Sequence, residues 1–220
     1  DNIPPVLSDN IPETIHNIPF TITISGTDAL SSVDTIQYKI NSDNWKTGST
    51  ILINSDGNHI IQYLGYDSLG NISSIITASK SARFDSTPPL PVHVLDEGNI
   101  SADTILEFSW NIPVDSNSIS NFFVEIDSST AFSTPFFSNW INKNELHFII
   151  SGDSGIIHGE TYYCRIKSKD DAGNISVFGT PSDGIYVDTS IAASSKPEPP
   201  EIYNYPSYVN QSYITLTGQK

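Results

Sequence analysis

With 220 residues and a mass of 24.1 kDa, the chain is long enough to bury one or two hydrophobic cores. Its formal net charge of -15 opposes binding to nucleic-acid phosphates and to anionic lipid head groups. The single Cys excludes an internal disulfide framework, and no apolar run reaches the roughly 18 residues of a membrane-spanning helix. We therefore expect a folded segment with no nucleic-acid partner and no membrane insertion.

The first predicted module covers residues 1–86 and consists of short strands. Apolar side chains alternate with polar ones in three stretches, which predicts one buried face. The inward residues are Phe20, Ile22, Ile24, Ile36, Tyr38, Ile40, His59, Ile61 and Tyr63. Trp45 follows the second stretch and is expected to support the structure, and Asp56-Gly57-Asn58 predicts a turn before the third.

The second predicted module covers residues 87–190 and shows the same alternation. Its inward residues are Leu106, Phe108, Trp110, Phe122, Val124, Ile126, Tyr162, Cys164 and Ile166. No stretch has the apolar period of an amphipathic helix, and turn residues separate the strands. The fold class predicted for the whole chain is all-β, with tandem β-sandwiches.

Two repeated features set the module boundaries. DSLGNIS at residues 67–73 and DDAGNIS at residues 170–176 are 103 residues apart (170 - 67 = 103). Proline pairs at Pro4-Pro5, Pro88-Pro89 and Pro199-Pro200 each open a unit, because Pro suits a stiff linker or an edge strand better than an element interior. Residues 191–220 are then a linker and the first strands of a truncated third module, so we expect a segment of a longer polypeptide.

The second module resembles a fibronectin type III domain. The resemblance is carried by LEFSWNIP, FFVEID and HGETYYCRIKSKDDAGNIS, and it covers nearly all of residues 88–190. It implies that Trp110 is the centre of the core and that Tyr162 is a tyrosine-corner residue, whose hydroxyl bonds to nearby backbone. Cys164 would then be a small buried hydrophobe with an inert thiol.

The first module is similar to Ig-like repeats of bacterial cell-surface proteins. TITISGTDALSSVDTIQYKINSDNW and GNHIIQYLGYDSLGNIS carry this similarity over most of residues 1–86. Such modules occur in tandem on adhesins, surface-layer proteins and secreted polysaccharide-degrading enzymes, nearly always as non-catalytic parts. The resemblance implies an extracellular or cell-surface location, with other modules of the same polypeptide, a cell-surface protein or a polysaccharide as partners.

Motifs for catalysis are missing from the sequence. The five His residues stand singly, without the spacing of a zinc site. GxSxG, GxxxxGK[ST] and GxGxxG are absent, which removes the common nucleophile and phosphate-binding signatures. A pair of carboxylates for glycoside chemistry stays open, because any two of the 25 acidic residues can meet in the fold. We predict no catalytic residue and no enzyme in this segment.

The two DxxGN sequences have a structural and a functional interpretation. In the structural one, Gly70 and Gly173 adopt positive φ, while the carboxylates, Asn71 and Asn174 bond turn amides. In the functional one, Asp67 and Asp170 contribute oxygen ligands to Ca²⁺, although no DxDxDG loop is present. The structural interpretation is favoured, and calcium is the only cofactor considered.

Exposed aromatic residues are the candidates for a binding surface. Tyr66 lies on the outer face of the first module with Ile60 and Leu64, and the second module offers Phe132, Phe136, Phe137 and Trp140. The alternative is that these rings cover an open sandwich edge or a module junction. Two functions remain: a structural or adhesive spacer, which leads, and an accessory carbohydrate-binding segment of a secreted polysaccharide-degrading enzyme.

Overall fold

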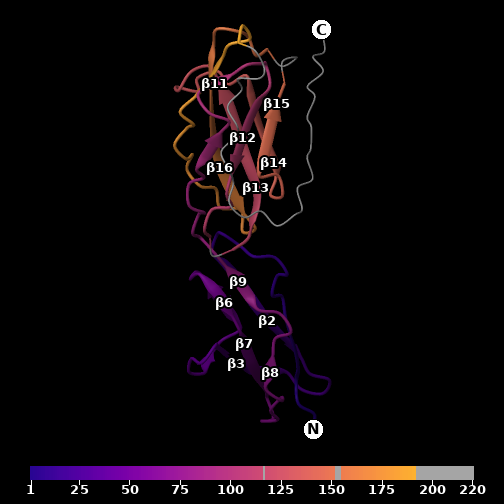
Figure 1. Cartoon of the computed structure of the whole chain (residues 1–220). Coiled ribbons are helices and arrows are strands. Elements are labelled where there is room, and N and C mark those ends of the chain that lie inside the picture. The colour runs from indigo at the N-terminus through magenta and orange to yellow at the C-terminus, as the bar shows by residue number, and fades with distance from the viewer. Residues whose placement is uncertain (116, 152–154, 192–220) are drawn as a thin grey trace. The chain divides into compact units, whose positions relative to one another are not determined.

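The computed structural model describes residues 1–115, 117–151 and 155–191. The chain divides into two compact units, Asp1–Thr87 and Pro88–Lys220 (Figure 1). This division lies one residue beyond the boundary expected after residue 86. All regular elements among the described residues are β-strands, so the predicted all-β class is confirmed. The expected third module lies outside the described residues from residue 192 onward.

The first unit contains two sheets and a short strand pair. β1 (Val6–Asp9), β2 (Phe20–Thr27) and β5 (Thr50–Ile53) form an antiparallel sheet in the order β1-β2-β5. The second sheet has the order β4-β3-β7-β8 and consists of β4 (Lys46–Thr47), β3 (Val33–Ile40), β7 (Ile61–Asp67) and β8 (Ile76–Thr77). β6 (Gly57–His59) pairs with β9 (Ala82–Phe84).

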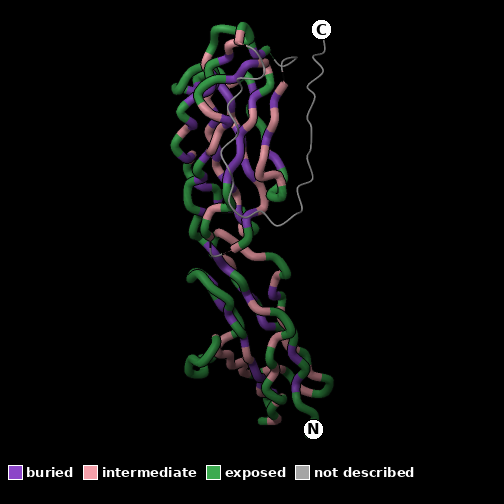
Figure 2. Tube along the Cα trace, viewed as in Figure 1, coloured by how far each residue is buried: buried purple, intermediate pink, exposed green. Residues whose placement is uncertain are grey.

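The core of the first unit lies between its sheets. Ile22 and Ile24 of β2 are buried while their neighbours Thr21, Thr23 and Ser25 are exposed, as their alternation predicts. Figure 2 shows how buried and exposed positions are distributed along the chain. One expectation was wrong: residues 59–63 are not one strand. The chain changes partner at Ile60, because β6 pairs with β9 whereas β7 pairs with β3. Ile60 is therefore 53% exposed at the break.

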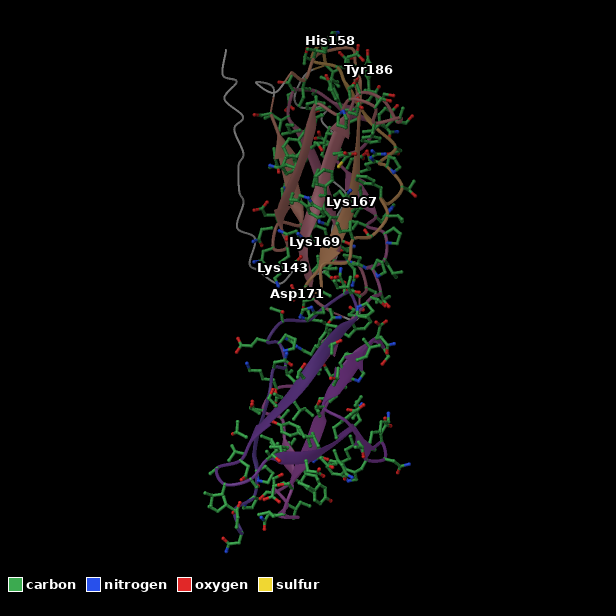
Figure 3. All side chains as sticks on the ribbon, turned by 180° about the vertical axis from the view of Figure 1, so that it is seen from behind. Lys143, His158, Lys167, Lys169, Asp171 and Tyr186 are labelled. Atoms are coloured by element: carbon green, nitrogen blue, oxygen red, sulfur yellow. The ribbon has the colours of Figure 1, made fainter. Side chains whose placement is uncertain are left out.

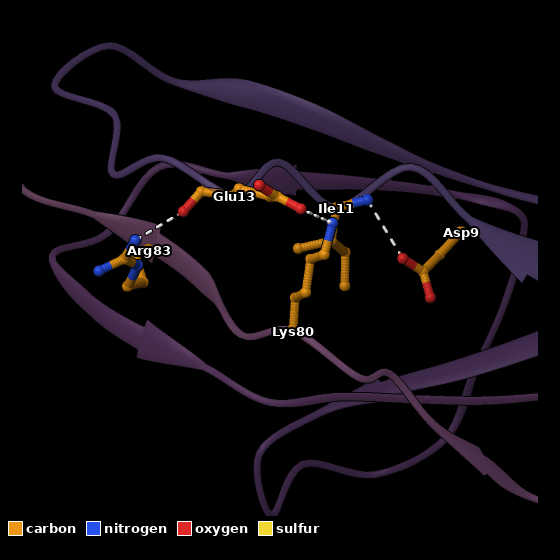
Figure 4. A network of polar contacts seen from close by, with 5 residues as sticks. All are labelled: Asp9, Ile11, Glu13, Lys80 and Arg83. Carbon is orange, nitrogen blue, oxygen red and sulfur yellow. Dashed lines mark hydrogen bonds and ion pairs between the residues drawn. The ribbon is translucent and has the colours of Figure 1, made fainter.

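The segment between β1 and β2 is tied to the end of the first unit by polar contacts (Figure 4). Arg83 Nη2 donates to the carbonyl of Glu13 at 2.6 Å, and Lys80 Nζ lies 2.7 Å from Glu13 Oε1. Earlier in the same segment, the amide of Ile11 donates to Asp9 Oδ1 at 3.1 Å. The contacts of Glu13 hold this segment next to β9 and the residues just before it.

The second unit is a sandwich of a three-stranded and a five-stranded sheet. The smaller sheet has the order β10-β12-β15, with β10 (Val94–Asp96), β12 (Leu106–Trp110) and β15 (His147–Ile150). The larger has the order β11-β17-β16-β13-β14, with β11 (Ile100–Ser101), β17 (Ile185–Val187), β16 (Thr161–Asp170), β13 (Ile119–Asp127) and β14 (Phe137–Asn142). β11 pairs with β17 in parallel, and the other pairs are antiparallel.

The inward faces of β12, β13 and β16 build the core of the second unit. All nine residues predicted to point inward on these strands are buried: Leu106, Phe108, Trp110, Phe122, Val124, Ile126, Tyr162, Cys164 and Ile166. Along β16, buried residues alternate with half-buried ones over the whole strand. The outward positions carry Arg165, Lys167 and Lys169, which therefore share one face of the five-stranded sheet.

The described residues contain no helix that is both long and apolar enough to cross a membrane.

Candidate functional site

The two DxxGN turns share one set of hydrogen bonds. In the first unit, Asp67 Oδ1 accepts from the Asn71 amide at 2.7 Å and Oδ2 accepts from Asn71 Nδ2 at 2.8 Å. In the second, Asp170 accepts from the amide and side chain of Asn174, both at 2.8 Å. Gly70 and Gly173 adopt φ of 90° and 95°, which glycine tolerates best. Both turns thus have the geometry that the structural interpretation expects.

Asp67 is a buried carboxylate that stays ionised. It is 2% exposed, and burial alone raises its pKa. Hydrogen bonds from Asn71, Ser31 and Leu69 outweigh that effect and lower the pKa of Asp67 to about 2. Because these donors stabilise the charged form, the negative charge is a fixed part of the turn at neutral pH.

Two further carboxylates lie beside Asp67 in the first unit. Oxygens of Asp1, Asp28 and Asp67 lie within 4.8 Å of one another, which is close enough to share a cation. Asp28 Oδ1 accepts from the amides of Leu30 and Ser31, while its Oδ2 is buried and accepts no hydrogen bond within the described part of the chain. The donor set consists of hard oxygens, which suits Ca²⁺.

Tyr162 makes the backbone contacts expected of a tyrosine corner. Its hydroxyl accepts from the amide of Ile157 at 3.0 Å and donates to the carbonyl of Gly155 at 3.3 Å. Next along the inward face of β16, Cys164 is fully buried. Burial raises the pKa of the Cys164 thiol well above its usual range, and the nearby Asp96 adds to this. The thiolate that a nucleophile needs is therefore disfavoured.

The two tryptophans expected to be structural lie in different environments. Trp110 is 0% exposed and packs edge-on against Phe122, with ring centroids 5.6 Å apart. Trp45 is 36% exposed and lies outside the core of the first unit. Its ring is instead covered by Lys39, whose Nζ lies 5.4 Å from the ring centroid. Trp45 therefore contributes a surface contact and no core packing.

The four rings predicted as binding residues are not gathered on one surface. Phe137 is 6% exposed and packs on Phe148 in the core, so it offers no outer surface. Phe136 is 37% exposed and lies edge-on against Tyr162. Tyr66 is half-buried on β7 of the first unit, where it pairs with Thr35. Only Trp140 stands among other rings on an outer sheet face.

Trp140 belongs to a surface that the sequence did not reveal. We call it the aromatic-cation face, and it consists of the rings of Phe123, Trp140 and Phe178 with the cations of Arg165, Lys167 and Lys169. The rings come from β13, β14 and the segment after β16, and the cations from β16. The alternating basic residues of β16 were a usable signal, but the rings between them come from distant parts of the chain.

Each cation of this face lies over an aromatic ring. Lys167 Nζ is 4.7 Å from the ring centroids of both Phe123 and Phe178. Arg165 is 4.1 Å from Phe178 and also 4.3 Å from Phe132, which is buried beside it. Lys169 Nζ is 4.9 Å from Trp140. These distances are those of cation–π contacts, so the face is a continuous stack of rings and positive charges.

Asp96 is a half-buried carboxyl group whose pKa is raised by its surroundings. Burial raises the pKa of Asp96 at the end of β10, and the neighbouring Asp183 raises it further. A hydrogen bond from the amide of Gly98 opposes the shift. Asp96 lies on β10, an edge strand of the smaller sheet. A raised pKa caused by burial and a neighbouring carboxylate does not by itself define a catalytic site.

No protein-family model matches the chain, and no curated protein matches it in sequence. Among solved structures, the FN1–FN3 domains of chicken CNTN1 align with a TM-score of 0.37 and 17% identity over 82% of this chain and 65% of that chain. The fibronectin(III)-like modules of Clostridium thermocellum CbhA align with a TM-score of 0.40 and 12% identity, over 85% of this chain and 97% of that chain. Domains A168–A170 of titin align with a TM-score of 0.46 and 14% identity, over 83% of this chain and 67% of that chain.

Because these TM-scores are below 0.5, the description of the fold rests on the strands themselves. The chain spans 65% of the CNTN1 segment that it resembles. Each unit packs its sheets around a core of its own. The chain is therefore a tandem of β-sandwich units, the architecture that its sequence predicted.

Proposed function

We propose that this chain is a non-catalytic, extracellular segment of a larger surface or secreted protein, in which sandwich modules space or display other parts. The proposal rests on one observation: the side chains that could react are engaged in the fold. Asp67 and Asp170 are engaged in turns, and the only Cys is buried with a raised pKa. Side chains that often do chemistry hold this fold together instead.

The spacer role is tested by pulling on the chain with a single-molecule force probe. Each unit has its own core, so we expect two separate unfolding events. A unit of 87 residues has an extended length of roughly 290–310 Å at about 3.3–3.6 Å per residue, so its unfolding should lengthen the chain by roughly 250–300 Å once the length of the folded unit is subtracted. One merged event, or extension without a force peak, would contradict the spacer role.

Calcium binding at the Asp67 turn is a second proposal, favoured by the proximity of Asp1, Asp28 and Asp67. Calcium sites of extracellular modules often have dissociation constants of about 0.1–1 mM, so excess Ca²⁺ should raise the melting temperature of the first unit by roughly 5 °C. A chelator should reverse the rise. Asp28→Asn should abolish it, whereas the exposed Asp34→Asn, with the same charge change in the same unit, should keep it.

A melting temperature that is indifferent to Ca²⁺ would remove this proposal. The spacer proposal would stand, because the hydrogen bonds of the turn do not depend on an ion.

The alternative role is an accessory carbohydrate-binding segment of a polysaccharide-degrading enzyme. What favours it is the aromatic-cation face of the second unit, since aromatic rings on an outer sheet face suit contact with sugar rings. The two roles are compatible, because a spacer module can also hold a ligand. They differ in what the rest of the polypeptide contains: a repeat array for a spacer, a catalytic domain for an accessory segment.

A further inference from the structure

The aromatic-cation face concentrates positive charge on a strongly acidic protein. The whole chain has 10 Lys and Arg against 25 Asp and Glu. On this face the balance is reversed: Arg165 bonds Glu125 at 2.6 Å, while Lys167 and Lys169 form no salt bridge with any described residue. Lys143 follows β14 and is exposed, and Asp171 lies beyond the end of β16. Figure 3 shows Lys143, Lys167 and Lys169 along the same side of the second unit.

The register of the strands arranges the face in rows across the sheet. Trp140, Phe123 and Lys167 are direct neighbours in one row, and Asn142, Asn121 and Lys169 form the next. Alternate residues along a strand are about 6.6–6.8 Å apart, so the cations of β16 form a line with a regular spacing. The line is flanked by Trp140 and Phe123, whose ring centroids are 5.1 Å apart. The face is an ordered strip of charge and rings.

The rings also fix where the positive charges lie. An exposed lysine normally samples many rotamers, and ordering it on binding costs conformational entropy. Here Lys167 is already held between Phe123 and Phe178, and Lys169 over Trp140. A ligand that meets these cations therefore loses less free energy to side-chain ordering than it would on a flexible basic surface.

We propose that the aromatic-cation face binds an acidic polysaccharide, a polymer in which carboxylate groups alternate with the apolar faces of sugar rings. Charge complementarity requires an anionic partner, because the two lysines lack carboxylate partners among the described residues. The interleaved rings favour a sugar polymer over an acidic peptide, since sugar rings offer apolar C–H groups to the half-buried rings of Trp140 and Phe123, whereas acidic side chains offer only carboxylates. The net charge of -15 opposes every polyanion, most strongly the closely spaced phosphates of a duplex nucleic acid, so the cations of this face must carry the binding.

The inference rests on the proposed non-catalytic role, because it assigns a ligand to a module that holds the polymer without cleaving it. The test measures binding of the full chain to polygalacturonate by calorimetry, with dextran as a neutral polysaccharide, polyglutamate as an acidic peptide and an oligothymidylate as a single-stranded nucleic acid. We expect binding to polygalacturonate, weakened by added salt, and no binding to dextran.

Matched variants distinguish binding at the aromatic-cation face from a general effect of the protein's charge. K167Q/K169Q should weaken polygalacturonate binding about tenfold or more, since two charged contacts are lost. The control K39Q/K46Q makes the same charge change in the first unit, where Lys39 also covers a tryptophan, and should bind like the unaltered chain. K167R/K169R keeps both charges and should retain binding. Urea denaturation of each variant shows whether it is folded.

Several results would overturn the inference. These are an unaltered chain that does not bind polygalacturonate, equal losses in K167Q/K169Q and K39Q/K46Q, or polyglutamate or the oligothymidylate binding at least as tightly as the polysaccharide. Shortening of the polygalacturonate during incubation would have a different meaning. It would contradict the non-catalytic role and leave the binding face standing.

Discussion

Replacing Trp110 by Ala is expected to destabilise the second unit by about 4 kcal/mol, which is the usual cost of emptying a fully buried tryptophan site. Trp110 is 0% exposed in β12 and packs against Phe122 of the opposite sheet. The methyl group of Ala does not fill the volume of the indole ring, so the substitution leaves a cavity between the sheets. Because small domains are stable by only about 5–15 kcal/mol, the variant should be close to unfolding at physiological temperature.

The measurement is urea denaturation of the full chain, from which the free energy of unfolding of each unit is obtained. Trp45→Ala is the matched control, since it removes the same side chain from a 36% exposed site of the first unit. Its loss should stay near 1 kcal/mol, the value of one exposed contact with Lys39. Equal costs for the two variants would show that the burial of Trp110 does not decide the stability of the sandwich.

The different burial of Trp110 and Trp45 shows what the sequence can and cannot predict. Trp110 continues the alternation of Leu106 and Phe108, so a local period of two places it inside. Trp45 follows the end of β3 and precedes β4, where no alternation applies. Whether Trp45 faces the core or the solvent depends on how the residues between β3 and β4 place its ring against Lys39. A local sequence pattern does not encode this.

The turns were predictable for the same reason that Trp110 was. Each depends on hydrogen bonds between an Asp and an Asn four residues later, so the information is contained in five consecutive residues. The break at Ile60 was not predictable, because residues 59–64 alternate like one strand, whereas β9 pairs with residues 57–59 and β3 with residues 61–67.

The aromatic-cation face shows the same limit at a functional site. The basic residues of β16 are visible in sequence, but Trp140 reaches them only through the pairing of β14 with β13 and of β13 with β16. Phe178 reaches them because the chain after the Asp170 turn runs back beside β16, where Gly179 bonds Ile166 and Ser182 bonds Cys164. Contacts set by non-local pairing cannot be read from periodicity.

That returning segment leads to the second large effect. Gly179→Ala is expected to destabilise the second unit by about 3 kcal/mol, because the space for a side chain is already filled by backbone. A Cβ at Gly179 would lie 1.7 Å from the carbonyl oxygen of Val92 and 2.8 Å from its carbonyl carbon. Val92 is itself buried in the core, so it cannot move without disturbing its neighbours.

Gly159→Ala is the control that isolates this steric effect. Gly159 has a φ of 89° and nothing within 4 Å of an added Cβ, so its replacement costs backbone strain alone, about 1 kcal/mol. Gly179 does not adopt positive φ, so its cost comes from the contact with Val92. Urea denaturation should therefore rank Gly179→Ala well above Gly159→Ala.

The same variant connects the packing to the proposed ligand. Phe178 precedes Gly179 directly, and it covers both Arg165 and Lys167. If the backbone at Gly179 shifts to admit a methyl group, Phe178 should move with it and loosen both cations. Folded Gly179→Ala should then bind polygalacturonate more weakly than folded Gly159→Ala, which leaves the face untouched. Unchanged stability together with unchanged binding would show that the contact between Gly179 and Val92 does not constrain this segment.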